Sequence, residues 1–189
     1  MIDWTANAKL RQTAAVAQCG GVIAYPTEAV WGLGCDPWNE RAFQSLLALK
    51  RRPLHKGVIL IADSVDKFCP FLTGIDARHR ALIAGPAANP TTWLVPDNGV
   101  VPRWVIGEHS TLALRVTTHP VAAALCKLFN GPLVSTSANP ASLPPARSAL
   151  KVRCYFANAL DAIAPGQVGA HPRPSQIRDL YSGEVLRNS

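Results

Sequence analysis

The segment Val58-Ile59-Leu60-Ile61-Ala62 is an uninterrupted run of apolar residues, three of them β-branched. Such a run predicts a short strand that is covered on both faces, because a half-exposed strand alternates apolar and polar residues. Similar apolar strands are expected at Val22–Tyr25, ended by Pro26, and at Leu133–Thr136. The chain is therefore expected to fold around a buried sheet.

Helix-forming stretches separate these strands. Asp3 is placed to cap a helix that runs to Gln18, and Asn39 to cap a second helix that runs to Lys50. The residues between the first strand and the second helix, 26–38, are expected to form a loop. Other helices are expected at 121–129 and 148–159, with a short one from Asp63 or Ser64. Further strands are expected at 92–95, 111–116, 176–178 and 185–187.

This alternation predicts an α/β fold, and the close spacing of strands after residue 90 predicts hairpins within the same sheet. The expected fold is thus a mixed parallel and antiparallel sheet flanked by helices. A length of 189 residues with 48% hydrophobic content suits a single domain over residues 1–189. Because no linker or repeat divides the chain, no second domain is expected.

The composition limits where in the cell the protein is expected and which partners it is expected to bind. No apolar run approaches the roughly 18 residues of a membrane span, and the N-terminus lacks a signal-peptide pattern. The five cysteines are widely spaced and form no Cys-x-x-Cys pair, so neither a disulfide framework nor a zinc site is expected. A cytoplasmic protein is expected. The net charge of +7 favours anionic partners such as nucleotides or nucleic acid.

Several familiar site patterns are missing from the sequence. It has no phosphate-binding P-loop, and Gly32-Leu33-Gly34 lacks the third glycine of a dinucleotide-binding turn. It also has no paired histidines for a metal and no Gly-x-Ser-x-Gly turn of a serine hydrolase. His119, which precedes Pro120, is interpreted as a turn residue.

Three polar segments stand out against this background. The first, residues 25–34, follows a buried strand and carries Thr27 and Glu28 beside glycines that permit close approach of a ligand. A structural turn, with Glu28 as a cap, is the other interpretation.

The second segment, residues 50–56, carries four positive charges in seven residues. Some of these charges can complement a helix C-terminus, but a polyanion such as a triphosphate would stabilise the whole cluster.

The third segment is Ser135-Thr136-Ser137-Ala138-Asn139, again at the end of an apolar strand. Its hydroxyl and amide groups suit a phosphate or a sugar, although a turn rich in Ser and Asn is the commoner role of such a stretch. If the strands that carry these segments are parallel neighbours, all three segments would line one crevice.

Taken together, the motifs resemble those of the YrdC family. The resemblance rests on Tyr25-Pro26-Thr27-Glu28, on Lys50-x-Arg52 with Lys56, on Leu114-Arg115-Val116, and on Ser135–Asn139, which occur in this order. It covers about residues 8–188. It implies the YrdC-like fold, a twisted mixed sheet around a central basic cavity.

The resemblance also implies an activity, the condensation of L-threonine, bicarbonate (or CO₂) and ATP into threonylcarbamoyl-AMP and pyrophosphate. The product would serve threonylcarbamoyladenosine modification of tRNAs that read codons starting with A. The implied partners are therefore tRNA and the tRNA threonylcarbamoyltransferase complex (TsaD, TsaB and TsaE). Mg²⁺ is expected as a cofactor, held through the ATP phosphates rather than by protein ligands.

Residue roles carry over only where motifs match. The implied ATP-binding residues are Lys50, Arg52, Lys56, Thr111, Ser137, Asn139 and Arg187. The implied threonine-binding residues are Thr27, Arg115, Ser135 and Ser175. Lys50 and Arg52 are the expected electrostatic catalysts, and no covalent intermediate is expected.

Two stretches depart from the family pattern. Residues 87–92 keep only Pro90 and Thr92 of a usual Trp-Pro-Gly-Pro-x-Thr, and Ser142 replaces a usual glycine. If that turn needs a positive φ, Ser142 would be strained by about 1 kcal/mol. Two alternatives stay open: an RNA-binding protein without adenylate chemistry, and a carbamoyl-adenylate chemistry like that of hydrogenase-maturation carbamoyltransferases.

Overall fold

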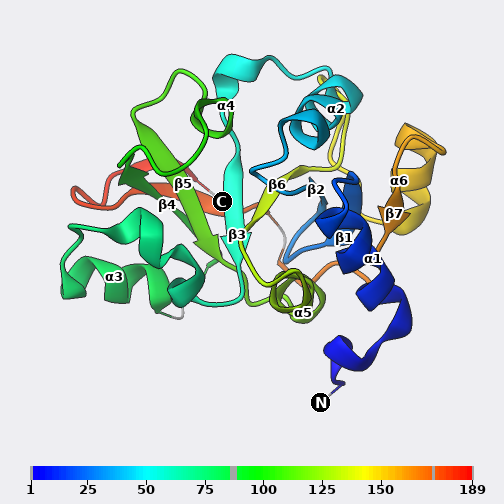
Figure 1. Ribbon diagram of the computed structural model, residues 1–189, viewed down its shortest axis with the longest axis horizontal. Coiled ribbons are helices and arrows are strands. Elements are labelled where there is room, and N and C mark those ends of the chain that lie inside the picture. Colours follow the sequence, from blue (N-terminus) through cyan, green and yellow to red (C-terminus); the bar gives the residue numbers. More distant parts are fainter. Residues whose placement is uncertain (1, 86–88, 172, 189) are drawn as a thin grey trace.

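The computed structural model describes residues 2–85, 89–171 and 173–188. Within these ranges the strands form a nine-stranded sheet in the order β7-β1-β2-β6-β3-β5-β4-β8-β9 (Figure 1). The strands are β1 (Ile23–Pro26), β2 (Trp31–Gly34), β3 (Ile59–Ala62), β4 (Thr91–Pro96), β5 (Thr111–Val116), β6 (Leu133–Ser137), β7 (Ala162–Ile163), β8 (Gln176–Asp179) and β9 (Val185–Arg187).

The helices connect these strands. The α-helices are α1 (Ala8–Gln18), α2 (Glu40–Lys50), α3 (Ala77–Ala84), α4 (Arg103–Ile106), α5 (Pro120–Phe129) and α6 (Ala149–Phe156). Three segments are 3₁₀ helices: η1 (Trp4–Ala6), η2 (Leu54–Lys56) and η3 (Val65–Leu72). No helix within the described ranges is long and apolar enough to cross a membrane.

The apolar run at residues 58–62 forms the central strand, as predicted. β3 pairs in parallel with β5 on one side and antiparallel with β6 on the other. Leu60, Ile61 and Ala62 are fully buried. The predicted mixed sheet is therefore confirmed, because both kinds of pairing meet at this strand.

Separate apolar clusters cover the two faces of the sheet. On one face Leu10 of α1 and Leu125 of α5 belong to the same cluster as Ile61. On the other face Phe43 of α2 and Phe68 of η3 share a cluster with Leu60. Since successive strand residues point to opposite faces, one short strand supplies both clusters. The predicted α/β class, a mixed sheet flanked by helices, is confirmed.

The expected loop over residues 26–38 is wrong in its middle. Trp31–Gly34 forms β2, which pairs antiparallel with β1 and with β6. The glycines in this stretch hide the strand pattern, yet the packing requires one of them. A Cβ at Gly34 would lie 2.4 Å from the Val134 carbonyl oxygen and 2.8 Å from the Tyr25 ring. Glycine therefore lets the Tyr25 ring lie across this strand.

The predicted helix from Asp3 to Gln18 is also divided. Asp3 caps η1, and α1 begins after Asn7, whose side chain accepts a hydrogen bond from the Leu10 N–H at 3.0 Å. A second capping residue four positions along therefore starts the true helix. Helices α3 and α4 were not predicted, and α6 ends at Phe156 rather than near residue 159.

Two glycines, Gly57 and Gly107, allow the loop before β3 to pack against the end of α4. Gly107 has a φ of +70°, and a Cβ there would lie 2.4 Å from the His55 carbonyl oxygen and 2.7 Å from the Gly57 nitrogen. The Glu108 N–H also donates a hydrogen bond to the His55 carbonyl at 3.1 Å. This backbone contact fixes the loop that carries Lys56.

We expect Gly107→Ala to lower the free energy of unfolding by at least about 2 kcal/mol, because it adds a backbone clash to left-handed strain. Gly99→Ala is the matched control, since Gly99 has a φ of +77° with nothing within 4 Å of an added Cβ. It should cost only about 1 kcal/mol. Chemical denaturation measures both values, and equal losses would contradict the proposed contact.

Candidate active site

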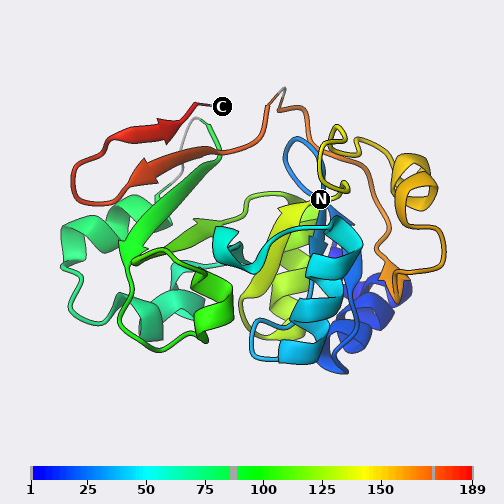
Figure 2. The ribbon, with the colours of Figure 1, turned by 90° about the horizontal axis from the view of Figure 1, so that it is seen from above.

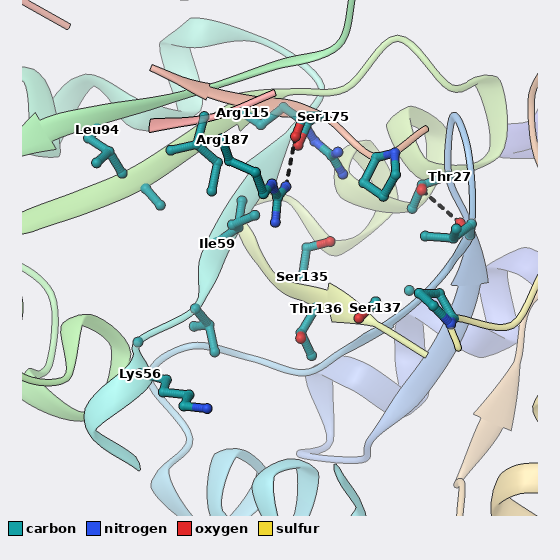
Figure 3. A pocket seen from close by; sticks show the side chains of 18 of the residues that line it. Thr27, Lys56, Ile59, Leu94, Arg115, Ser135, Thr136, Ser137, Ser175 and Arg187 are labelled. Carbon is teal, nitrogen blue, oxygen red and sulfur yellow. Dashed lines mark hydrogen bonds between the residues drawn. The ribbon is translucent and has the colours of Figure 1, made fainter. Parts of the chain in front are cut away.

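A cavity of about 570 Å³ opens on one face of the sheet. Nine of the eleven residues singled out from the sequence line it, although they come from six separate parts of the chain. They are Thr27, Arg52, Lys56, Thr111, Arg115, Ser135, Ser137, Ser175 and Arg187. In Figure 3, Lys56 and Thr27 lie on opposite sides of the cavity, with Ser135 between them.

Strand register explains how the floor of the cavity is built. Ile59 of β3 is the register partner of Ala113 in β5 and of Ser135 in β6, so these three side chains point to the same face. Thr111 and Arg115 share that face with Ala113, because they are two residues away on either side. Arg115 and Thr111 are therefore about 13 Å apart along one strand.

The strands that bring the polar segments together are not parallel neighbours, which corrects the sequence interpretation. β6 runs antiparallel to β3, so the start of β3 lies beside the end of β6. β2 separates β1 from β6 and runs antiparallel to both. The ends of β1 and β6 consequently point the same way. Antiparallel pairing therefore places the basic loop before β3 beside the hydroxyl groups after β6.

The charged side chains of the lining are mostly cationic. Arg52, Lys56, Arg115 and Arg187 line the cavity, and Glu28 is the one carboxylate among the described lining residues. Arg52 also shapes the loop, because its Nη2 donates to the carbonyls of Lys56 and Gly57 at 3.1 and 2.9 Å. Its Nε is buried without a hydrogen-bond partner. Burial lowers the pKa of Arg52 from its ordinary value.

Lys50 and Asn139 are the two predicted site residues outside the lining. The Lys50 ammonium group is buried and donates to the carbonyls of Ser137 and, at 2.8 Å, of Asn139. The Asn139 amide donates to the Leu143 carbonyl at 2.7 Å. Burial, followed by the nearby Arg52 charge, lowers the pKa of Lys50 to about 8. Through these hydrogen bonds Lys50 fixes the backbone of the segment after β6.

The same segment contains the predicted strain. Ser142 has a φ of +68°, so a serine occupies a left-handed position that favours glycine. The Ala141 N–H donates to the Lys50 carbonyl at 2.8 Å. The turn is therefore tied to the end of α2. The other departure from the family pattern, the stretch before β4, falls partly on residues 86–88, which lie outside the described residues. β4 itself begins at Thr91.

Several hydroxyl groups of the site are already engaged by the protein. The Thr27 hydroxyl donates to the Val30 carbonyl at 2.7 Å, which closes the turn after β1. The Ser175 and Thr92 hydroxyls are 2.9 Å apart and share a hydrogen bond. The Arg187 Nη2 donates to the Ser175 carbonyl at 2.7 Å, as the dashed line in Figure 3 shows. The C-terminal hairpin is thus attached to the cavity wall.

Glu28, which the first polar segment brought forward without assigning it a substrate, also lines the cavity. Its Oε1 accepts hydrogen bonds from the Thr117 hydroxyl at 2.6 Å and from the Thr118 N–H at 3.2 Å. Its Oε2 lies 3.7 Å from Nη1 of Arg115. Burial would raise the pKa of Glu28, but the Arg115 charge and the Thr117 hydrogen bond together hold it below its ordinary value.

The segment between β7 and β8 crosses the molecule (Figure 2) and is hydrogen-bonded to the turn that carries Glu28. The Gly169 and His171 N–H groups donate to the carbonyls of Thr27 and Glu28 at 2.9 and 3.1 Å. His119 joins this segment to α5: its Nδ1 faces the Ala122 N–H, and its Nε2 lies 3.0 Å from the Gln167 carbonyl. His119 therefore caps α5, in line with its interpretation as a turn residue.

The donor set does not suit a protein-held metal ion. Among the described residues, no group of three or more His, Cys, Asp and Glu side chains could hold one. Glu28 is a single carboxylate, and its Oε1 already accepts hydrogen bonds from Thr117 and Thr118. The histidine of the lining, His109, has no second carboxylate with it there. The lining is instead rich in cationic and hydroxyl side chains, which suit anions.

Comparison with known proteins agrees with this geometry. Residues 15–189 match the model of the Sua5/yciO/yrdC family, which carries the description "telomere recombination". The chain belongs to this family. A threonylcarbamoyl-AMP synthase of Cellvibrio japonicus is 52% identical over 189 residues, covering all of both chains. A threonylcarbamoyl-AMP synthase of Stutzerimonas stutzeri is 54% identical and covers 98% of this chain and 97% of its own.

Solved structures share the fold. A crystal structure of P. abyssi Sua5 complexed with L-threonine has a TM-score of 0.82 at 29% identity, covering 91% of this chain and 51% of that one. E. coli YciO has a TM-score of 0.79 at 24% identity, and covers 95% of this chain and 88% of its own. The second likeness concerns the fold alone. The expected YrdC-like fold is confirmed as a mixed sheet flanked by helices.

The lowered pKa of Glu28 predicts a pH dependence of stability. Because the folded pKa lies below the ordinary value of 4.5, the ionised group stabilises the fold above that pH. This contribution is lost as the pH falls through the folded pKa. The free energy of unfolding should therefore fall more steeply below about pH 4.5 in the wild type than in Glu28→Gln. Denaturant titrations between pH 3 and 7 measure this, and equal slopes would contradict it.

Proposed function

We propose that this protein is a threonylcarbamoyl-AMP synthase, which condenses L-threonine, bicarbonate or CO₂, and ATP with release of pyrophosphate. The single observation that carries the proposal is one cavity in which a basic loop and Arg115 converge with the hydroxyl groups of β6. The full-length relatives that carry this name support it. The enzyme class is accordingly nucleotidyl transfer.

The two substrates are assigned to opposite ends of the cavity. Arg52 and Lys56 suit the ATP phosphates, and Thr111, Ser137 and Arg187, which also line the cavity, are assigned to the nucleotide. At the other end Arg115 suits the carboxylate of threonine. Thr27, Ser135 and Ser175 are assigned to the same amino acid. The separation of Thr111 and Arg115 along β5 leaves room for both substrates in a line.

Lys50 and Asn139 take a different part in the proposed site. The Lys50 ammonium group fixes the carbonyls of Ser137 and Asn139, and Asn139 holds the following turn. We assign both residues to positioning Ser137 against the nucleotide. The long-range field of the buried Lys50 charge adds to that of the basic loop.

The reaction follows from charge and proximity. The threonine amine and CO₂ form a carbamate, and its oxygen then attacks the α-phosphorus of ATP. The new P–O bond forms as the bond to pyrophosphate breaks, so negative charge grows on the leaving group. We assign Arg52 and Lys56 to neutralise this charge, because transfers of this kind depend on positioning and electrostatic stabilisation. No side-chain nucleophile is needed.

Mg²⁺ is proposed to accompany ATP. The described lining offers one carboxylate, Glu28, whose Oε1 already accepts hydrogen bonds from Thr117 and Thr118. The ion would therefore be held by phosphate oxygens and water, which is its usual preference. When bound it supplies further charge neutralisation on the phosphates.

The downstream partners follow from the product. We propose that threonylcarbamoyl-AMP passes to the tRNA threonylcarbamoyltransferase complex, which would place the group on tRNA, and that this takes place in the cytoplasm. An RNA-binding protein without adenylate chemistry is not favoured, because the relatives that match over the whole chain are named as synthases. A likeness to HypF at 15% identity concerns the fold alone.

The direct test is an omission assay on the purified protein. We expect pyrophosphate release with threonine, bicarbonate and ATP together, and background release when any one of the three is left out. The product should carry both AMP and threonine by mass spectrometry. Release that is independent of threonine or of bicarbonate would overturn the proposed reaction.

Variants of the basic segment test the site itself. Arg52→Ala should lower pyrophosphate release by about 100-fold or more, because a preorganised charge beside the leaving group is lost. Lys50→Ala should have a comparable effect through the displaced Ser137 backbone. Arg41→Ala, an exposed arginine on α2, is the matched control and should leave the rate unchanged. Near-normal turnover by both Arg52→Ala and Lys50→Ala would refute the assignment.

A further inference from the structure

Two opposite charges lie buried side by side in the wall of the cavity. Glu28 is 5% exposed and Arg115 is 7% exposed, and both line the cavity. The closest charged atoms, Oε2 of Glu28 and Nη1 of Arg115, are 3.7 Å apart. That distance permits an ion pair but is too long for a good hydrogen bond. The protein itself therefore does not complete this pair.

Each partner keeps an unsatisfied polar atom. Oε2 of Glu28 and Nε of Arg115 are buried without a hydrogen-bond partner in the described part of the chain. A buried charge that lacks hydrogen bonds is costly, so such a pair is stable only where something else satisfies it. Both residues line the cavity. One unsatisfied acceptor and one unsatisfied donor in its wall are complementary to a ligand that offers a donor and an acceptor.

Glu28 cannot turn away to satisfy its free oxygen elsewhere. Thr117 and Thr118 hold the other carboxylate oxygen, and His171 holds the Glu28 backbone carbonyl. Gly169 packs so closely that an added Cβ would lie 2.7 Å from that carbonyl oxygen. The position of Oε2 is consequently fixed before any ligand arrives, which lowers the entropic cost of binding.

We propose that Glu28 binds the ammonium group of the α-amino acid whose carboxylate is bound by Arg115. The inference rests on the proposed function, in which that amino acid is threonine. An α-amino acid carries its carboxylate and its ammonium group on one carbon atom, so both reach the pair together. The zwitterion then replaces the incomplete contact between Glu28 and Arg115 with two charge-assisted interactions.

The ionisation state of Glu28 determines whether it acts as an ammonium ligand or as a base. The Arg115 charge and the Thr117 hydrogen bond outweigh burial and keep the pKa of the carboxyl group low, so it stays anionic at neutral pH. Such a group binds an ammonium ion well but is a weak base. Glu28 therefore selects substrates that carry an α-ammonium group, and the proton leaves to solvent or bicarbonate before the amine reacts.

The test compares two ligands by isothermal titration calorimetry, with and without ATP. The first is L-threonine, and the second is 2,3-dihydroxybutyrate of the same configuration, in which a hydroxyl group replaces the ammonium group. Wild-type protein should bind threonine roughly 10- to 100-fold more tightly than the hydroxy acid, the range of a charge-assisted hydrogen bond. Glu28→Gln should lose most of this preference by weakening threonine alone.

The controls separate the possible failures. Glu28→Asp keeps the charge and should recover part of the preference, whereas Glu40→Gln removes an exposed carboxylate and should change nothing. Equal weakening of both ligands by Glu28→Gln would mean that Glu28 only orients Arg115 and would overturn the inference. Equal affinities of the two ligands for the wild type would overturn it without any variant. A wild type that binds no threonine at all would instead overturn the proposed function.

Discussion

The antiparallel pairing of β6 with both of its neighbours is the constraint on which the site depends. β6 lies between β2 and β3, and its C-terminal half carries Ser135 and Ser137. Because β3 runs in the opposite direction, the loop before β3 returns to the end of β6 and brings Lys56 with it. Because β2 also runs in the opposite direction, the end of β1 arrives from the other side with Thr27. Three distant segments thus meet in one cavity through backbone hydrogen bonds.

Charge is distributed unequally around this cavity, and burial gives the distribution its effect. The basic loop leaves Lys56 exposed, while Arg115 and Glu28 lie almost fully buried at the other end. Electrostatic interactions are stronger where water is excluded, so the buried end can distinguish ligands by individual charged groups. The exposed end is suited to attracting a polyanion. The exposed end therefore suits a nucleotide, and the buried end suits an amino acid.

The turn after β6 shows how the scaffold serves the site at some cost in stability. Lys50 is buried to hold two carbonyl groups, and Ser142 occupies a left-handed backbone position. Both features are unfavourable by themselves. They are tolerated because the rest of the segment is anchored: the Ala146 N–H donates to Ala138 and the Trp31 N–H to Ala146. Rigid support of Ser137 is the result.

The sequence alone determined the central strand and the α/β class, because continuous apolar runs depend only on local order. Its resemblance to the YrdC family supplied nine of the residues that line the cavity. The sequence missed β2, whose glycines conceal the strand pattern, and it took Asp3 rather than Asn7 as the cap of α1. Tertiary structure alone decided that Lys50 fixes a turn outside the lining and that Glu28 meets Arg115, 87 positions further along the chain. Such pairings depend on strand order and direction, which no local pattern of residues encodes.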